Sequence, residues 1–271
     1  MRIEVVDAMA LEGSAVSAAL ISDLREKIGD ATPDVALLFL SSAYFEHAEA
    51  IATRIVEEIG AAHFVGVCSS SVIGNEREFE NEAAASLWTA QLPEYAEAQS
   101  FGIKRRRAGA YEFEGQEGQF ADPATLFLFS IPGTFSEKDF LSTLRESQPE
   151  SQVLGGRTCG ERGQQLLFHA KGKTVGDPFR REEGAVAINL AEVYVCAVVS
   201  QGCRPFGKAS TITKADGNEL QQLGSHSASE RFDEEVESLS LDERRLLKPG
   251  AHIGRLLHTS RARGEHGDFQ I

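Results

Sequence analysis

The sequence predicts an α/β protein, because strand-length apolar runs alternate with segments whose apolar residues recur at helical spacing. The alternation occurs twice with the same order of strand, helix and strand, which favours an internally duplicated fold. Strand–helix–strand units normally place their two strands parallel in one sheet, and the further strands that follow each unit indicate that the sheets are mixed. An α+β arrangement of the same elements is the alternative fold class.

The first copy covers residues 30–92 and follows an N-terminal helix, Ser14 to Ile28, which ends before Gly29. The run from Asp34 to Leu40 reads as a strand buried on both faces. A helix is predicted from Tyr44 to Ile59, because Phe45, Ala48, Ala52, Ile55 and Ile59 share one face. The returning strand is His63 to Cys68, and a further strand runs from Ala85 to Leu92.

The second copy covers residues 123–190 and repeats this order. Thr125 to Phe129 is the first strand, and a helix capped by Ser136 follows it. Gln152 to Gly156 is the returning strand, and strands at 166–171 and 185–190 complete the copy. The polar segment from Pro93 to Asp122 between the copies is interpreted as a linker or surface excursion.

A second, smaller and partial α/β domain is predicted to begin after residue 192. The first domain then spans 1–192 and the second 193–271, and the apolar run from Val193 to Val199 opens the second as a strand. Gln201 to Pro205 is interpreted as a hinge, since Pro205 restricts the exit of the chain.

The charge balance indicates which classes of partner the protein can bind. The net charge is −14, from 41 acidic and 27 basic residues, and such a field repels phosphate backbones and acidic lipid headgroups. We therefore expect neither a nucleic-acid partner nor membrane insertion, and we interpret the basic run Lys104 to Arg107 as a solvated loop. The first residues have no signal-peptide order, so a cytoplasmic location with reduced cysteines is expected.

Each returning strand runs into a turn rich in small residues, and these turns are the candidate ligand site. In the first turn Cys68, Ser69, Ser70 and Ser71 offer hydroxyls and backbone N–H groups to a polar ligand. In the second, Gly155 and Gly156 permit close backbone approach, Arg157 suits a carboxylate, and Thr158 adds a hydroxyl. We expect both turns to border one pocket between the copies. A tight turn that needs small residues for packing is the alternative.

An enzyme is the competing interpretation, with Cys68 or Ser70 as nucleophile. A nucleophile needs a base within hydrogen-bond reach, and His63 lies on the opposite face of the strand from Cys68. His47 and His169 would reach the turn only through the tertiary fold. A protein-interaction scaffold without a small ligand is a third class.

Five segments of the chain resemble the FIST family: PDVALLFLSS, GVCSSSVIGNEREFENEAAASL, QVLGGRTCG, GAVAINL and VVSQGCRPFGKASTITKADGNELQQL. The resemblance implies a FIST N domain followed by a shortened FIST C domain. It also implies an intracellular sensory module that binds a small ligand, such as an amino acid or organic acid, and acts in signal transduction. Since the sequence carries no output domain, a separate signalling protein would receive the signal.

Haem is a further cofactor alternative, because some proteins resembling this family bind it as gas sensors. A haem site needs an axial ligand in an apolar crevice. His47, His63 and His169 are the histidines considered for that role.

Overall fold

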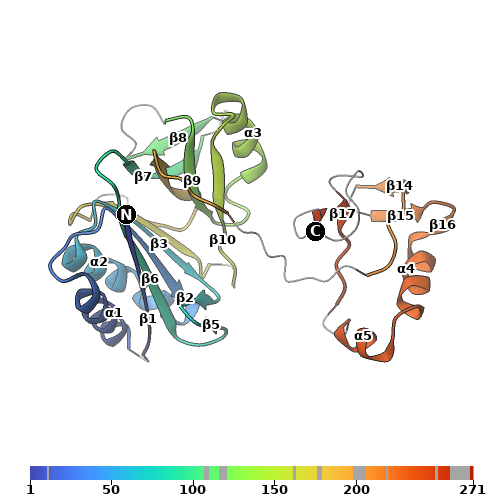
Figure 1. Cartoon of the computed structure of the whole chain (residues 1–271), viewed down its shortest axis with the longest axis horizontal. Coiled ribbons are helices and arrows are strands. Elements are labelled where there is room, and N and C mark those ends of the chain that lie inside the picture. Colours follow the sequence, from blue (N-terminus) through green and yellow to red (C-terminus); the bar gives the residue numbers. More distant parts are fainter. Residues whose placement is uncertain are drawn as a thin grey trace. The chain divides into compact units, whose positions relative to one another are not determined.

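The computed structural model describes residues 1–10, 12–106, 110–115, 121–160, 163–175, 179–197, 206–217, 219–247, 250–256 and 269–270. The chain forms two compact units, Met1–Val195 and Cys196–Ile271 (Figure 1). The predicted hinge at 201–205 lies outside the described residues.

A six-stranded mixed sheet in the first unit has the order β1-β6-β2-β3-β11-β12. Its strands are β1 (Arg2–Met9), β6 (Ala84–Gln91), β2 (Val35–Ser41), β3 (His63–Ser69), β11 (Leu166–Lys171) and β12 (Arg180–Arg181). The strands β2 and β3 pair in parallel, as the strand–helix–strand pattern predicts, and the other pairs are antiparallel. Six of the seven residues of β2 are buried, which fits its apolar sequence and its place inside the sheet.

A five-stranded mixed sheet in the same unit has the order β10-β9-β13-β7-β8. Its strands are β10 (Gln152–Arg157), β9 (Ala124–Ser130), β13 (Ala185–Ala191), β7 (Glu97–Arg105) and β8 (Tyr111–Glu114). The pair β9 and β10 is parallel, and the remaining pairs are antiparallel. A short hairpin of β4 (Val72–Ile73) and β5 (Glu78–Phe79) follows the first turn.

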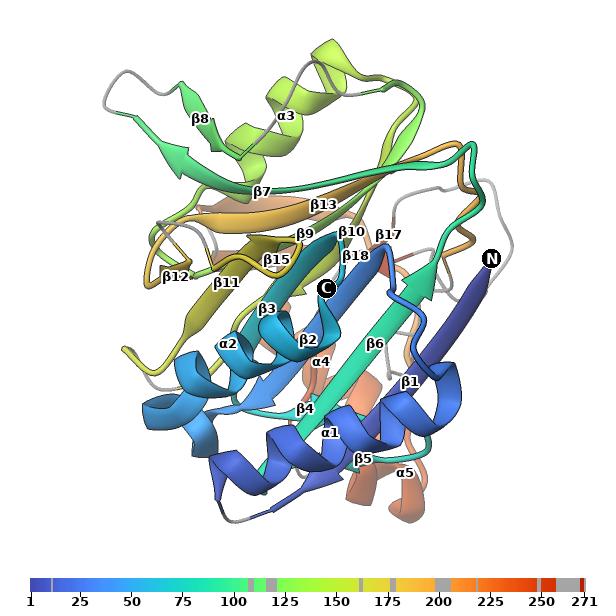
Figure 2. The ribbon, with the colours of Figure 1, turned by 90° about the vertical axis from the view of Figure 1, so that its left-hand side faces the viewer.

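The first unit has four layers, with the two sheets packed face to face between helices (Figure 2). The helices α1 (Gly13–Ile28) and α2 (Ala48–Ile59) cover the outer face of the six-stranded sheet, and α3 (Glu137–Ser147) covers that of the five-stranded sheet. Between the sheets lies a core that includes Leu37, Val65 and Ile188, and the rings of Phe39 and Phe129 meet at 5.6 Å. These layers confirm the α/β class with mixed sheets.

Three predicted elements differ in the structure. The segment 93–122 is not a linker, because β7 pairs with β13 inside the sheet and buries Phe101 and Ile103. The helix predicted from Tyr44 begins as a 3₁₀ segment, η1 (Ser42–His47), and turns into α2 only at Ala48. The apolar run from Val193 forms no strand in its described residues 193–197, where Tyr194 is 91% exposed.

The basic run after β7 is tied down by acidic partners rather than free in a loop. Lys104 and Arg105 end β7, and their side chains pair with Glu114 and Asp139 at 3.2 and 2.9 Å. Arg106 pairs with Glu112 of β8, while Arg107 lies outside the described residues.

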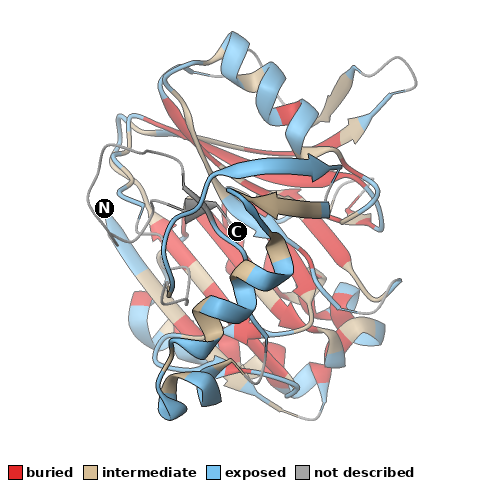
Figure 3. Ribbon diagram, turned by 90° about the vertical axis from the view of Figure 1, so that its right-hand side faces the viewer, coloured by how far each residue is buried: buried red, intermediate tan, exposed pale blue. Residues whose placement is uncertain are grey.

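The described residues of the second unit form a small three-stranded antiparallel sheet, a separate pair of short strands and two short helices. They are β14 (Ile212–Asp216), β15 (Glu219–Leu223), β16 (His226–Ser227), α4 (Ala228–Glu237) and α5 (Leu241–Leu246), with a strand pair β17 (Arg255–Leu256) and β18 (Phe269–Gln270). Among its residues 206–217, 219–247 and 250–254, none is buried, in contrast to the strands of the first unit (Figure 3). None of the described helices of the chain is long and apolar enough to cross a membrane.

Candidate functional site

The two predicted turns come together in the structure. The first follows the carboxyl end of β3 and the second follows the carboxyl end of β10. The backbone N–H of Ser70 donates to the carbonyl of Cys159 at 2.9 Å, and the N–H of Cys159 donates to Ser69 Oγ at 2.8 Å. Ser69 Oγ also lies 3.2 Å from the carbonyl oxygen of Cys159. Residues 90 positions apart are thus joined at the ends of two different sheets.

The thiol of Cys159 lies at the centre of this junction. Its Sγ is 2.8 Å from Ser70 Oγ and 3.3 Å from Ser69 Oγ, and the residue is exposed. Hydrogen bonds from the hydroxyls of Ser69 and Ser70 stabilise the thiolate and lower the pKa of Cys159 below its usual value. Cys159 was not among the residues predicted to line the site. The sequence feature that could have identified Cys159 is that each turn contains both a cysteine and a hydroxyl residue.

Cys68, which was expected to line the site or to act as nucleophile, instead belongs to the core. Its side chain is 0% exposed among the residues between the sheet and the helices α1 and α2. Burial raises the pKa of the Cys68 thiol to about 12, and Sγ lies 3.7 Å from the Ser41 carbonyl. A thiol in this state is protonated and closed to reagents at neutral pH.

Thr158 and Gly155 serve the pairing of β10 with β9. Thr158 is 3% exposed, and both its N–H and its hydroxyl donate to the carbonyl of Ser130, at 2.9 and 3.3 Å. Gly155 has φ +135°, and a Cβ there would collide with the carbonyl oxygen of Leu128. These two residues therefore hold the turn in place rather than offering polar groups to solvent.

Four of the predicted site residues are exposed, namely Ser71, Gly155, Gly156 and Arg157, while Ser69 and Ser70 are half-buried. Arg157 is not free: its Nε lies 3.2 Å from Glu137 Oε1 on α3, and Ser130 Oγ donates to the same oxygen at 2.7 Å. Arg157 is 58% exposed at its side chain. An anionic ligand would have to displace Glu137 from this guanidinium or bind to it beside Glu137.

The three histidines considered as a base or haem ligand lie in different surroundings. His47 borders a hollow between α1 and α2 that also includes Ser14 and Arg54. His63 Nδ1 accepts from the N–H of Ser100 at 3.1 Å, across the two sheets. His169 is half-buried beside Glu114, and within the described residues no group of His, Cys, Asp and Glu side chains is arranged to hold a metal ion.

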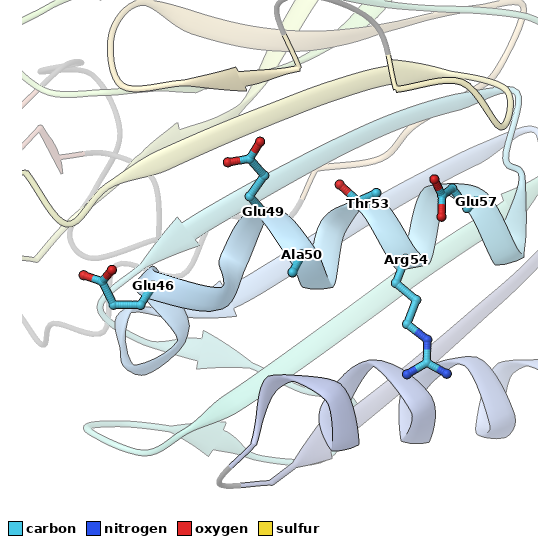
Figure 4. A pocket seen from close by; sticks show the side chains of 6 residues that line it. All are labelled: Glu46, Glu49, Ala50, Thr53, Arg54 and Glu57. Atoms are coloured by element: carbon cyan, nitrogen blue, oxygen red, sulfur yellow. The ribbon is translucent and has the colours of Figure 1, made fainter.

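Another hollow lies along the outer side of η1 and α2 and is lined by Glu46, Glu49, Ala50, Thr53, Arg54 and Glu57. Figure 4 shows these side chains spread along one open helix surface, with Arg54 directed toward α1. Arg54 donates there to the Ser14 carbonyl at 3.1 Å. The hollow is acidic and open, and it does not include the residues of the two turns.

A comparison with protein families matches residues 34–226 to the FIST N domain. The chain belongs to the FIST family. The match includes both turns and both strand–helix–strand units, and FIST is a domain class assigned to sensing and signalling.

Similar proteins occur in mycobacteria. This FIST protein is 28% identical over 273 residues to the uncharacterized protein Rv0628c of Mycobacterium tuberculosis, an alignment that covers 100% of this chain and 69% of the relative. It is 29% identical over 255 residues to the uncharacterized protein Mb0898c of Mycobacterium bovis, covering 91% of this chain and 62% of that relative. Both relatives are therefore longer than the matched region.

Proposed function

We propose that this FIST protein is a small-ligand sensory module whose ligand binds where the two turns meet, at residues 69–71 and 156–160. The observation that carries the proposal is the junction of Ser69 and Ser70 with Cys159. It brings the carboxyl ends of two parallel strand pairs to one place.

The position agrees with where α/β folds bind ligands. Polar ligands commonly bind beyond the carboxyl ends of parallel strands, where loops leave the sheet. Here each parallel strand ends on or just before a hydroxyl residue: Ser41 ends β2, Ser69 ends β3, Ser130 ends β9, and Thr158 directly follows β10. Duplicated strand–helix–strand units would produce this symmetry, and the duplication remains part of the proposal.

The exposed groups favour a polar ligand of the amino-acid or organic-acid class. The hydroxyl of Ser71 and the guanidinium of Arg157 are exposed, and the open backbone at Gly156 allows a ligand to approach. Because the whole chain has a net charge of −14, a carboxylate ligand needs a local positive group to bind, and an arginine supplies one. A separate signalling protein would then read the liganded state.

The test is a thermal-shift screen of the protein against amino acids, organic acids, nucleotides and hemin. A ligand at about 100 times its dissociation constant adds about 2.7 kcal/mol to the free energy of unfolding, which raises the midpoint by several degrees. The Ser69→Ala/Ser70→Ala double variant should lose the shift. Ser142→Ala, on the exposed side of α3, should keep it.

Arg157→Ala distinguishes the ligand class. It should abolish the shift caused by an acid and leave the shift of an uncharged ligand unchanged. If the double serine variant responds like the unchanged protein, the site lies elsewhere. If no compound shifts a well-folded sample, the interaction-scaffold interpretation replaces the sensor, and a response to hemin alone points to a histidine site.

A second candidate is thiol chemistry at Cys159, which the 2.8 Å approach of Ser70 Oγ to Sγ favours. It replaces Cys68 as the nucleophile of the enzyme interpretation. Turnover would still need a general base near Sγ, and the side-chain groups that the described residues place within hydrogen-bond distance of Sγ are the hydroxyls of Ser69 and Ser70.

A further inference from the structure

A buried arginine lies between the two sheets of the first unit. Arg181 on β12 has a side chain that is 2% exposed, and its Nη2 donates to the carboxylate of Glu114 on β8. The contact crosses from the six-stranded to the five-stranded sheet. A buried guanidinium is unfavourable unless its N–H groups find acceptors.

Most of the N–H donors of Arg181 have no acceptor among the described residues. The nitrogens Nε and Nη1 are closed to solvent and have no acceptor in the part of the chain that the structure describes. An arginine carries five N–H donors, and buried donors in folded proteins are almost always paired with protein, water or an ion. Nε and Nη1 are therefore available to donate to a group that accepts hydrogen bonds.

The charges around Arg181 favour an anionic occupant. Glu114 is shared, because Lys104 Nζ also lies 3.2 Å from its Oε1, so two cations face one carboxylate. The neighbouring His169 adds no charge: burial and the charge of Arg181 lower its pKa to about 4, and the imidazole is neutral at pH 7. Lys171 also contributes positive potential at His169. The cluster is locally positive in a chain of net charge −14.

The backbone of the β7–β8 hairpin is shaped to admit these side chains. A Cβ at Gly102 would collide with the guanidinium of Arg181, so only glycine allows it to lie against β7. At Gly115, directly after Glu114, a Cβ would lie 3.1 Å from His169 Nε2. The placement of Arg181 thus depends on specific residues of the opposite sheet.

We propose that Arg181, oriented by Glu114, binds a small carboxylate-type anion between the two sheets through Nε and Nη1. This site is distinct from the two turns and goes beyond the proposed sensory site. Because both nitrogens are closed to solvent, the anion is small and its binding is coupled to the packing of the sheets. Anion binding therefore stabilises the folded first unit.

The test is thermal unfolding of the full chain titrated with sodium formate. The unchanged protein should show a saturable rise in midpoint, and Arg181→Met should lose the saturable part, with formate affinity reduced about tenfold or more. The matched control is Arg180→Met. Arg180 is adjacent and also charged, but it pairs with Glu49 and Glu182 on the other face of the sheet, so this variant should respond like the unchanged protein. General salt effects act on both variants alike.

Two further variants keep the test decisive. Glu114→Gln keeps a side-chain oxygen that can accept from Nη2 and orient the guanidinium, but it removes the negative charge that repels the anion, so formate should bind several-fold more tightly than in the unchanged protein. Arg181→Lys keeps the charge but lacks the planar set of N–H donors. It takes the place of Arg181→Met in the titration if that variant does not fold.

Equal formate responses of the unchanged protein and the Arg181 variants would overturn the proposal. So would the absence of a saturable response, which would mean that Nε and Nη1 are hydrated or left unpaired. The Ser69→Ala/Ser70→Ala variant should keep the formate response, so that the two proposed sites fail or succeed independently.

Discussion

At the scale of single residues, the two cysteines of the turns have opposite environments, although both lie close to the end of a strand. Cys68 is the last residue but one of β3 and points into the core, whereas Cys159 lies two residues beyond β10 and is exposed. One thiol is stabilised as the neutral form by burial, and the other as the thiolate by two hydroxyls. The reactivity of a cysteine depends on this difference.

We expect iodoacetamide at pH 7 to alkylate Cys159 in the folded protein while Cys68 reacts at least about 100-fold more slowly. Peptide mass mapping after short exposure measures both rates in one sample. Ser70→Ala should slow the alkylation of Cys159, because the thiolate loses a hydrogen-bond donor. In denaturant the two cysteines should react at similar rates. Comparable rates in the folded state would mean that Cys68 is reachable and would restore it as a candidate nucleophile.

At the scale of elements, the edge strand β10 contains adjacent glycines with different roles. Gly155 faces the neighbouring strand β9, and its positive φ and the nearby Leu128 carbonyl leave no place for a side chain. At Gly156, no heavy atom of the described structure lies within 4 Å of where a Cβ would be. The parallel pairing of β10, which carries the second turn, therefore depends on Gly155.

Gly155→Ala should lower the free energy of unfolding by about 2–4 kcal/mol, because it combines a strained φ with a collision against the backbone. Gly156→Ala is the matched control, and its effect should stay within about 1 kcal/mol. Urea unfolding of both variants gives the comparison. Equal losses would show that β10 tolerates a side chain at 155 by shifting away from β9.

At the scale of the whole molecule, the first unit is held by packing between two sheets that includes buried polar groups. His169 is half-buried there with its Nδ1 closed to solvent, and its pKa of about 4 in the folded state lies below the ordinary value of 6.5. Between these values the unfolded chain binds a proton that the folded chain does not. The folded state therefore loses stability as the pH falls through this window.

We expect the contribution of His169 to reduce the free energy of unfolding by about 1 kcal/mol per pH unit between about pH 6.5 and 4. The measurement is urea unfolding at several pH values, for the unchanged protein and for His169→Gln. The difference between their stabilities should change across this window and level off above pH 7. A constant difference would show that the folded protein protonates His169 as readily as the unfolded chain does.

Much of the fold could be predicted from residue patterns. The strand β2, the helix α1 and both strand–helix–strand units follow from apolar periodicity, because buried strands and amphipathic helices each leave a regular trace in the sequence. The strand β7 was missed, since Gln99, Ser100 and Gly102 give it a polar composition. Its strand conformation comes from pairing with β13, and a pairing partner about 85 residues away leaves no local trace.

The sequence by itself determined the class of the fold, the family and the two turns with small and hydroxyl residues, because these are local patterns. Only the tertiary structure decided which side chains serve a site. It placed Cys68 and Thr158 inside, brought Cys159 to Ser69 and Ser70, and paired Arg157 with Glu137. It also buried Arg181 between the sheets. Burial and long-range contacts depend on how distant segments pack, and a linear pattern does not contain that information.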